Sequence, residues 1–138
     1  MMANHLVKKL NKKDWQITLV DQFKSHYYQP GFLFIPFGTY QPEDVKRTID
    51  EFLPKGIQLI REKIDRIDKD TDTVILENGR NVKYDILIIA TGCKIAPEEV
   101  PGMKGDTWQK NIFDFYTFEG SCALAKKLTN RSLKAVPF

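Results

Sequence analysis

The chain has 138 residues, of which 42% are apolar and 28% are charged, and its formal net charge is +3. This length allows one domain with a packed core, and the composition is that of a soluble globular protein. The sequence has 21 basic and 18 acidic side chains. Because these numbers are nearly equal, we expect no nucleic-acid-binding surface. No apolar run reaches the roughly 18 residues of a membrane span, and the N-terminus lacks the apolar centre of a signal peptide.

The first half is expected to contain two helices, one strand and a long loop. Leu6, Val7 and Leu10 have helical spacing, which predicts a helix over Ala3–Asn11. The β-branched run "WQITLV" predicts a buried strand over Trp15–Val20, and "EDVKRTIDEFL" predicts a helix over Pro42–Leu53. The aromatics of the intervening loop form either a ligand-facing wall or, as we favour, a cover over the sheet: Phe23, Tyr27, Tyr28, Phe32, Phe34 and Phe37.

The second half is expected to contain strands and a final helix. Strand-like runs are "IQLIR", "KIDRIDKD", "TVILEN" and "VKYDILIIA", and Asn78-Gly79 predicts a hairpin turn with positive backbone angles. A helix is predicted over Phe115–Thr129. Apolar strands alternating with helices indicate an α/β fold with a mostly parallel sheet, from which the antiparallel hairpin is an excursion.

Two strand ends carry candidate ligand-binding residues. Asp21 closes "ITLVD", where an acid can accept hydrogen bonds from ribose hydroxyls, although a solvated acid would look the same. Ala90, Thr91 and Gly92 close "DILIIATG", where small residues let the backbone approach a ligand, although an ordinary turn would also fit.

Together, these features resemble the FAD-binding, Rossmann-like domain of the pyridine nucleotide–disulfide oxidoreductases. The segments "VDQFKSHYYQPGFLFIPFG" and "GIQLIREKIDRIDKDTDTVILENGRNVKYDILIIATG" are most similar to those of sulfide:quinone oxidoreductases, and "VPGM" follows them. The resemblance covers about Ala3–Leu128.

The resemblance implies FAD as cofactor and a role for nine residues. Asp21 and Gln22 would meet the adenosine ribose, and the backbone of Lys63 and Ile64 would contact the adenine. The remaining residues would line the flavin nucleotide or lie toward the isoalloxazine: Ala90, Thr91, Gly92, Pro30 and Gly31. In the full-length family, sulfide reduces the flavin and quinone reoxidises it, which implies a membrane-peripheral location there. Because this sequence shows no membrane span, signal peptide or disulfide framework, we expect a cytoplasmic location.

The chain departs from the family pattern in ways that predict an inactive fragment with little or no bound FAD. It contains no G-x-G, and therefore no Gly-rich phosphate turn. We expect residues 1–130 to form an incomplete domain and 131–138 an irregular tail. An NADH-dependent flavoprotein dehydrogenase fragment remains an alternative, as does a non-catalytic binding module that self-associates through an exposed sheet edge.

Cysteines and histidines offer little further chemistry. The spacing of Cys93 and Cys122 fits neither a disulfide framework nor a metal site. The family's sulfur-handling cysteine is expected near Phe113–Asp114, and neither residue is cysteine. We therefore favour Cys122 as a small core residue over a redox thiol, and expect neither His5 nor His26 to be catalytic or metal-bound.

Overall fold

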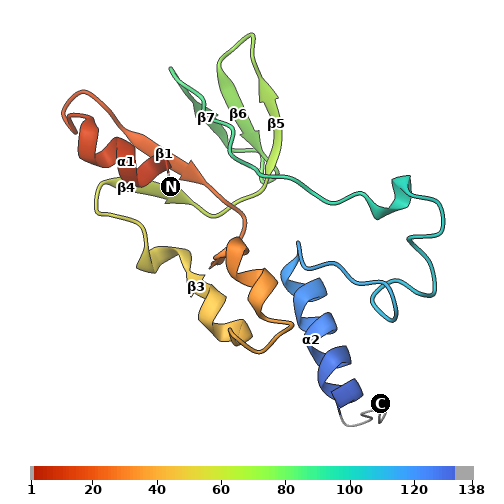
Figure 1. The fold of residues 1–138 in the computed structure, drawn as a ribbon. Coiled ribbons are helices and arrows are strands. Elements are labelled where there is room, and N and C mark those ends of the chain that lie inside the picture. Colours follow the sequence, from red (N-terminus) through yellow and green to blue (C-terminus); the bar gives the residue numbers. More distant parts are fainter. Residues whose placement is uncertain (1, 133–138) are drawn as a thin grey trace. The chain divides into compact units, whose positions relative to one another are not determined.

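The computed structural model describes residues 2–132, which form two compact units (Figure 1). One unit comprises Met1–His26 and Thr48–Ala90, and the other comprises Tyr27–Arg47 and Thr91–Phe138. Residues 133–138, most of the tail predicted at 131–138, lie outside the described residues. The mixed α/β fold class is confirmed, with a parallel strand pair and an antiparallel hairpin.

Residues 2–132 contain two helices, seven strands and four 3-10 turns. The helices are α1 (Met2–Lys9) and α2 (Phe118–Ser132). The strands are β1 (Ile17–Val20), β2 (Ser25–Tyr27), β3 (Lys46–Thr48), β4 (Ile57–Ile60), β5 (Ile64–Asp68), β6 (Thr73–Leu76) and β7 (Asn81–Lys83). The 3-10 turns are Gln29–Phe34, Pro42–Val45, Ile49–Glu51 and Pro97–Glu99.

The first unit is organised around a parallel pair of strands. β1 pairs with β4 in register, so that Ile17 lies opposite Ile57 and Val20 lies opposite Ile60. Figure 1 shows the two strands side by side with α1 next to β1. Parallel pairing of strands far apart in sequence is the defining feature of an α/β sheet, and it confirms the parallel arrangement expected from the sequence.

A three-stranded antiparallel sheet, in the order β5-β6-β7, completes the first unit. Its buried Val74 and Leu76 pack with Ile60 of β4, so one core serves both sheets. The predicted hairpin at Asn78-Gly79 is confirmed, but only Gly79 has a positive φ, of 82°. Its N–H donates to Leu76 O at 2.9 Å, and Leu76 N–H donates to Arg80 O, which is the geometry of a turn followed by a glycine bulge.

The second unit has a small aromatic core against α2. Phe32, Ile35 and Val45 are buried together, and Phe118 and Cys122 of α2 pack on them. The loop aromatics therefore divide: Tyr27 and Phe32 pack on this helix, while the others are exposed, namely Phe23, Tyr28, Phe34 and Phe37. Because the two packed rings contact a helix, the expectation that the loop aromatics cover the sheet is wrong.

The predicted helix over Pro42–Leu53 does not form. A 3-10 turn, strand β3 and a second 3-10 turn occupy most of these residues. Val45 and Ile49 are both buried and stand four positions apart, which imitates helical spacing. However, Val45 belongs to the core of the second unit and Ile49 to the first unit. The chain passes between the units here, so the two side chains do not share a helix face.

The apolar run Asp85–Ala90 is not the buried strand that the sequence predicted. No strand of residues 2–132 pairs with it. Ile86, Ile88 and Ile89 are 65%, 48% and 66% exposed. A strand needs a neighbouring strand for its backbone hydrogen bonds, and periodicity alone does not reveal whether one is present.

This exposure predicts a contrast between two core-like positions. Replacing Ile89 by asparagine should change the free energy of unfolding by less than about 0.5 kcal/mol, as at an ordinary surface site. Replacing Leu76, which is 1% exposed, by alanine should cost about 2–5 kcal/mol through loss of buried contacts. Urea denaturation measures both, and an equal loss in the two variants would contradict the described exposure.

Candidate functional site

The carboxyl ends of β1 and β4 form the candidate site in the first unit. Because the two strands run parallel and in register, Asp21 after β1 and Arg61 after β4 lie at the same edge. Asp21 N–H donates to Ile60 O at 3.1 Å, which extends the ladder one residue beyond the strand. Open α/β sheets bind ligands outside the carboxyl ends of their parallel strands. Asp21 thus follows the carboxyl end of a parallel strand, and its role toward a ligand stays a prediction.

Asp21 has one carboxylate oxygen engaged and one available. Its Oδ1 accepts the N–H of Phe23 at 2.9 Å, which fixes the turn after β1. Its Oδ2 makes no hydrogen bond to any residue in the described part of the chain. The side chain is half-buried, and Gln22 beside it is exposed. This free oxygen can accept a hydrogen bond from a ligand hydroxyl.

Arg61 is the residue at this edge that the sequence analysis missed. Its guanidinium forms an ion pair with Asp50 and donates to Phe23 O at 3.4 Å. It therefore ties the loop after β1 to the segment after β4 and positions the turn that holds Asp21. The signal was present in "IQLIR", since a charged residue directly after a buried strand must lie at the sheet edge.

Lys63 and Ile64 follow β4 and begin β5. Lys63 N–H donates to the Glu62 carboxylate at 3.0 Å, and Lys63 O accepts Glu77 N–H at 3.0 Å. The side-chain hydrogen bond to Glu77 raises the pKa of the Lys63 ammonium. Ile64 lies opposite Leu76 and packs on the core, with a register shift before Arg66. A ligand contact through Lys63 N–H would have to displace Glu62.

Pro30 and Gly31 lie in the 3-10 turn Gln29–Phe34 of the second unit. Pro30 is exposed and Gly31 is buried. A Cβ at position 31 would lie 2.5 Å from Val45 Cγ1 and 3.0 Å from Tyr28 Cδ1. Glycine is therefore required here by packing inside the unit, whether or not a ligand is nearby.

Ala90, Thr91 and Gly92 lie in an exposed stretch without regular structure. Gly92 has φ of 74°, a conformation that favours glycine, and an added Cβ would meet nothing within 4 Å. Ala90 belongs to the first unit, whereas Thr91 and Gly92 belong to the second. Within the first unit the structure thus brings together the segments that carry Asp21, Gln22 and Lys63.

The cysteines and His26 have different surroundings in the described part of the chain. Cys93 is exposed, and Cys122 packs in the aromatic core, where burial raises the pKa of its thiol. Since a raised pKa disfavours the thiolate, this placement suits a small core residue. His26 packs edge-on against Phe52, with ring centroids 5.6 Å apart. No cluster of metal-ligating side chains occurs within this part of the chain.

Comparison with known proteins identifies the family. Residues 3–134 match the family described as pyridine nucleotide-disulphide oxidoreductase. The chain belongs to this family. Among its members, the chain is 34% identical over 116 residues to the sulfide-quinone reductase of Aquifex aeolicus. That match covers 83% of the chain and 26% of the relative.

The structural comparison agrees with this family assignment. The sulfide:quinone oxidoreductase of Aquifex aeolicus superimposes with a TM-score of 0.72 at 31% identity, over 89% of this chain and 28% of that one. The chain is also 26% identical over 133 residues to alternative NAD(P)H-ubiquinone oxidoreductase C1 of Arabidopsis thaliana, covering 86% of the chain and 25% of the relative. The chain thus spans about a quarter of the length of these relatives.

The close packing around Gly31 yields a test of why glycine is needed there. Gly31→Ala should destabilise the chain by about 1–3 kcal/mol through overpacking against Val45. In a Gly31→Ala/Val45→Ala double variant, part of this loss should disappear because the clashing methyl group is removed. Urea denaturation of the double-mutant cycle measures the coupling. Strictly additive losses would show that the contact with Val45 is not the cause.

Proposed function

We propose that this chain is part of an FAD-dependent oxidoreductase that oxidises sulfide and transfers the electrons through flavin to quinone. The family membership and the 34% identity to a sulfide-quinone reductase support this proposal. The observation that carries it is Asp21, which follows a parallel strand and has a carboxylate oxygen left free at the carboxyl end of that strand.

The residues of this edge fit part of FAD. Asp21 Oδ2 would accept a hydrogen bond from a hydroxyl of the adenosine ribose, while Arg61 keeps the surrounding turn in place. Bound FAD supplies two-electron chemistry between a donor and an acceptor. The 138 residues contain no G-x-G turn for the pyrophosphate. We therefore propose that this chain alone binds FAD weakly and retains little of it through purification.

An NMR titration tests the ribose contact. Added FAD should shift the amide resonances of Asp21 and Gln22 in the chain labelled with nitrogen-15, and Asp21→Ala should weaken this binding by several-fold. Asp14→Ala is the matched control, because Asp14 is an exposed acid of the same unit outside the edge. FAD that shifts neither amide, or that binds the Asp21 variant as well as the wild type, would contradict the proposal.

The alternative electron donor is NADH, which is favoured by the similarity to an NAD(P)H-ubiquinone oxidoreductase. A longer polypeptide that carries residues 1–138 and FAD would separate the two activities. Under anaerobic conditions, sulfide should reduce the flavin and bleach its absorbance, whereas NADH should leave it oxidised. Bleaching by NADH alone would assign the dehydrogenase activity instead.

A non-catalytic role through self-association is the remaining alternative, and the exposed isoleucines favour it. Ile86, Ile88 and Ile89 lie in an exposed segment that pairs with no strand of residues 2–132. We propose that this segment pairs with its counterpart in a second copy of the chain. A compact monomer in size-exclusion chromatography at high concentration would contradict this pairing.

No helix among residues 2–132 is long and apolar enough to cross a bilayer.

A further inference from the structure

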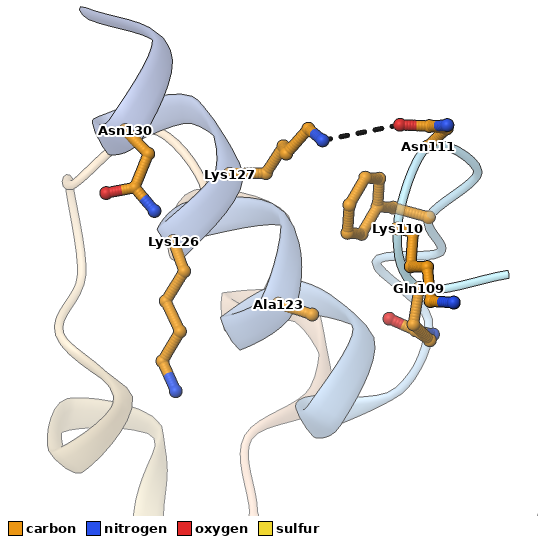
Figure 2. A pocket seen from close by; sticks show the side chains of 8 residues that line it. Gln109, Lys110, Asn111, Ala123, Lys126, Lys127 and Asn130 are labelled. Carbon is orange, nitrogen blue, oxygen red and sulfur yellow. Dashed lines mark hydrogen bonds between the residues drawn. The ribbon is translucent and has the colours of Figure 1, made fainter. Parts of the chain in front are cut away.

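A pocket in the second unit is lined by residues that the proposed FAD edge does not include. It is open, with a volume of about 600 Å³, between α2 and the loop that precedes this helix (Figure 2). Cavities of roughly 300–1,000 Å³ are typical of small-molecule sites. One wall is a single face of α2, and the other is the loop segment 109–111 with Phe113. The helix face consists of Ala123, Lys126, Lys127 and Asn130.

Hydrogen bonds hold the two walls of the pocket in place. Thr107 O accepts the N–H groups of Lys110, Asn111 and Ile112 at 2.9–3.1 Å, which closes the loop into a tight turn. Lys127 Nζ donates to Asn111 Oδ1 at 3.3 Å and joins the helix to the loop, as the dashed line in Figure 2 shows. The pocket is thus formed by the folded chain itself before any ligand binds.

Asp114 attaches the other end of the loop to the start of α2. Its Oδ2 accepts the side-chain amide of Gln109 at 2.9 Å, and its Oδ1 accepts Thr117 N–H at 2.7 Å. Thr117 Oγ1 in turn accepts Gly120 N–H at 3.0 Å, which caps the helix. Both oxygens of this carboxylate are therefore engaged in structure.

The pocket has a basic lining without a compensating acid. Three of its eight lining residues are lysines, Lys110, Lys126 and Lys127, and none is aspartate or glutamate. None of these lysines forms an ion pair with a residue in the described ranges. Without such a counterion in the lining, these lysines give the pocket a positive potential that attracts an anion.

The lining also has features that an inorganic ion would not use. Phe113, Ala123 and the methylene stems of the lysines present apolar surface. Gln109 Oε1 is buried and accepts no hydrogen bond from residues 2–130. An apolar surface with surrounding ammonium groups suits a ligand that has an apolar body and a carboxylate.

We propose that this pocket binds a small organic carboxylate with an aromatic or short aliphatic body. The ammonium group of Lys127, which reaches toward the loop, attracts the carboxylate, Lys126 adds positive charge from the same helix face, and the body of the ligand covers Phe113 and Ala123. This site is independent of the flavin assignment, because none of its residues belongs to the proposed FAD edge.

Benzoate is a suitable probe, with benzyl alcohol and benzylammonium as neutral and cationic partners of similar shape. In an NMR titration of the 138-residue chain, benzoate should cause saturable shifts at the amides of Asn111, Ala123 and Lys127. Benzyl alcohol should shift them several-fold less at the same concentration, and benzylammonium should not shift them. Absent shifts, or equal shifts with all three compounds, would overturn the proposal.

Charge-removing variants distinguish a local site from general attraction to a basic protein. Lys126→Gln/Lys127→Gln should weaken benzoate binding by several-fold. The matched control is Lys8→Gln/Lys9→Gln, which removes the same charge from neighbouring lysines near the end of α1. The control should bind benzoate as the wild type does. Equal weakening in both pairs would show that net charge alone attracts the probe, and the proposal would fail.

A second variant tests the apolar part of the site while all charges remain. Ala123→Phe places a ring on the helix face that lines the pocket, and it should prevent saturable shifts by benzoate at Asn111 and Lys127. Dispersed amide resonances throughout the rest of the spectrum would show that the variant is folded. Undiminished benzoate binding in a folded Ala123→Phe chain would overturn the assignment to this pocket.

Discussion

The parallel pairing of β1 with β4 is the interaction on which the candidate site depends. These strands lie about forty residues apart in sequence, and their register brings Val20 opposite Ile60. One more backbone bond, from Asp21 to Ile60, carries the pairing to the sheet edge. This pairing places the Asp21 carboxylate at the same edge of the sheet as Arg61. The contacts of Arg61 with Phe23 O and Asp50 keep the turn after β1 in position.

Packing alone accounts for some glycines that could also be explained by ligand binding. Gly31 resembles a glycine kept small for a flavin, yet its missing side chain already makes room for Val45 and Tyr28. Gly120 is similar, because a Cβ there would clash with the Asp114 carboxylate, which accepts Thr117 N–H just before α2. Asp21 differs from both, since one of its oxygens has no structural partner among residues 2–132.

Local chemistry made several elements predictable, and its failures have a common cause. Gly79 and its flanking β-branched residues specify a hairpin without distant contacts. The helix predicted around Val45 and the buried strand predicted around Ile88 are both wrong. An apolar pattern does not show which other segment packs against it. Val45 and Ile49 have helical spacing but belong to different units. The run that contains Ile86, Ile88 and Ile89 has the composition of a buried strand but is exposed. The strand pattern of "IQLIR" indicated the position of Arg61, but its contacts with Phe23 and Asp50 depend on the tertiary structure.

By itself, the sequence determined the family resemblance, the two helices, the hairpin and an acid at the end of the first strand. These features depend on residue type and short spacing, which act over a few positions. Tertiary structure alone decided which strand lies beside β1, which apolar residues are buried, and that α2 and the loop 109–111 enclose a lysine-lined pocket. Those outcomes depend on partners distant in the chain, and the periodicity of one segment carries no information about its partner.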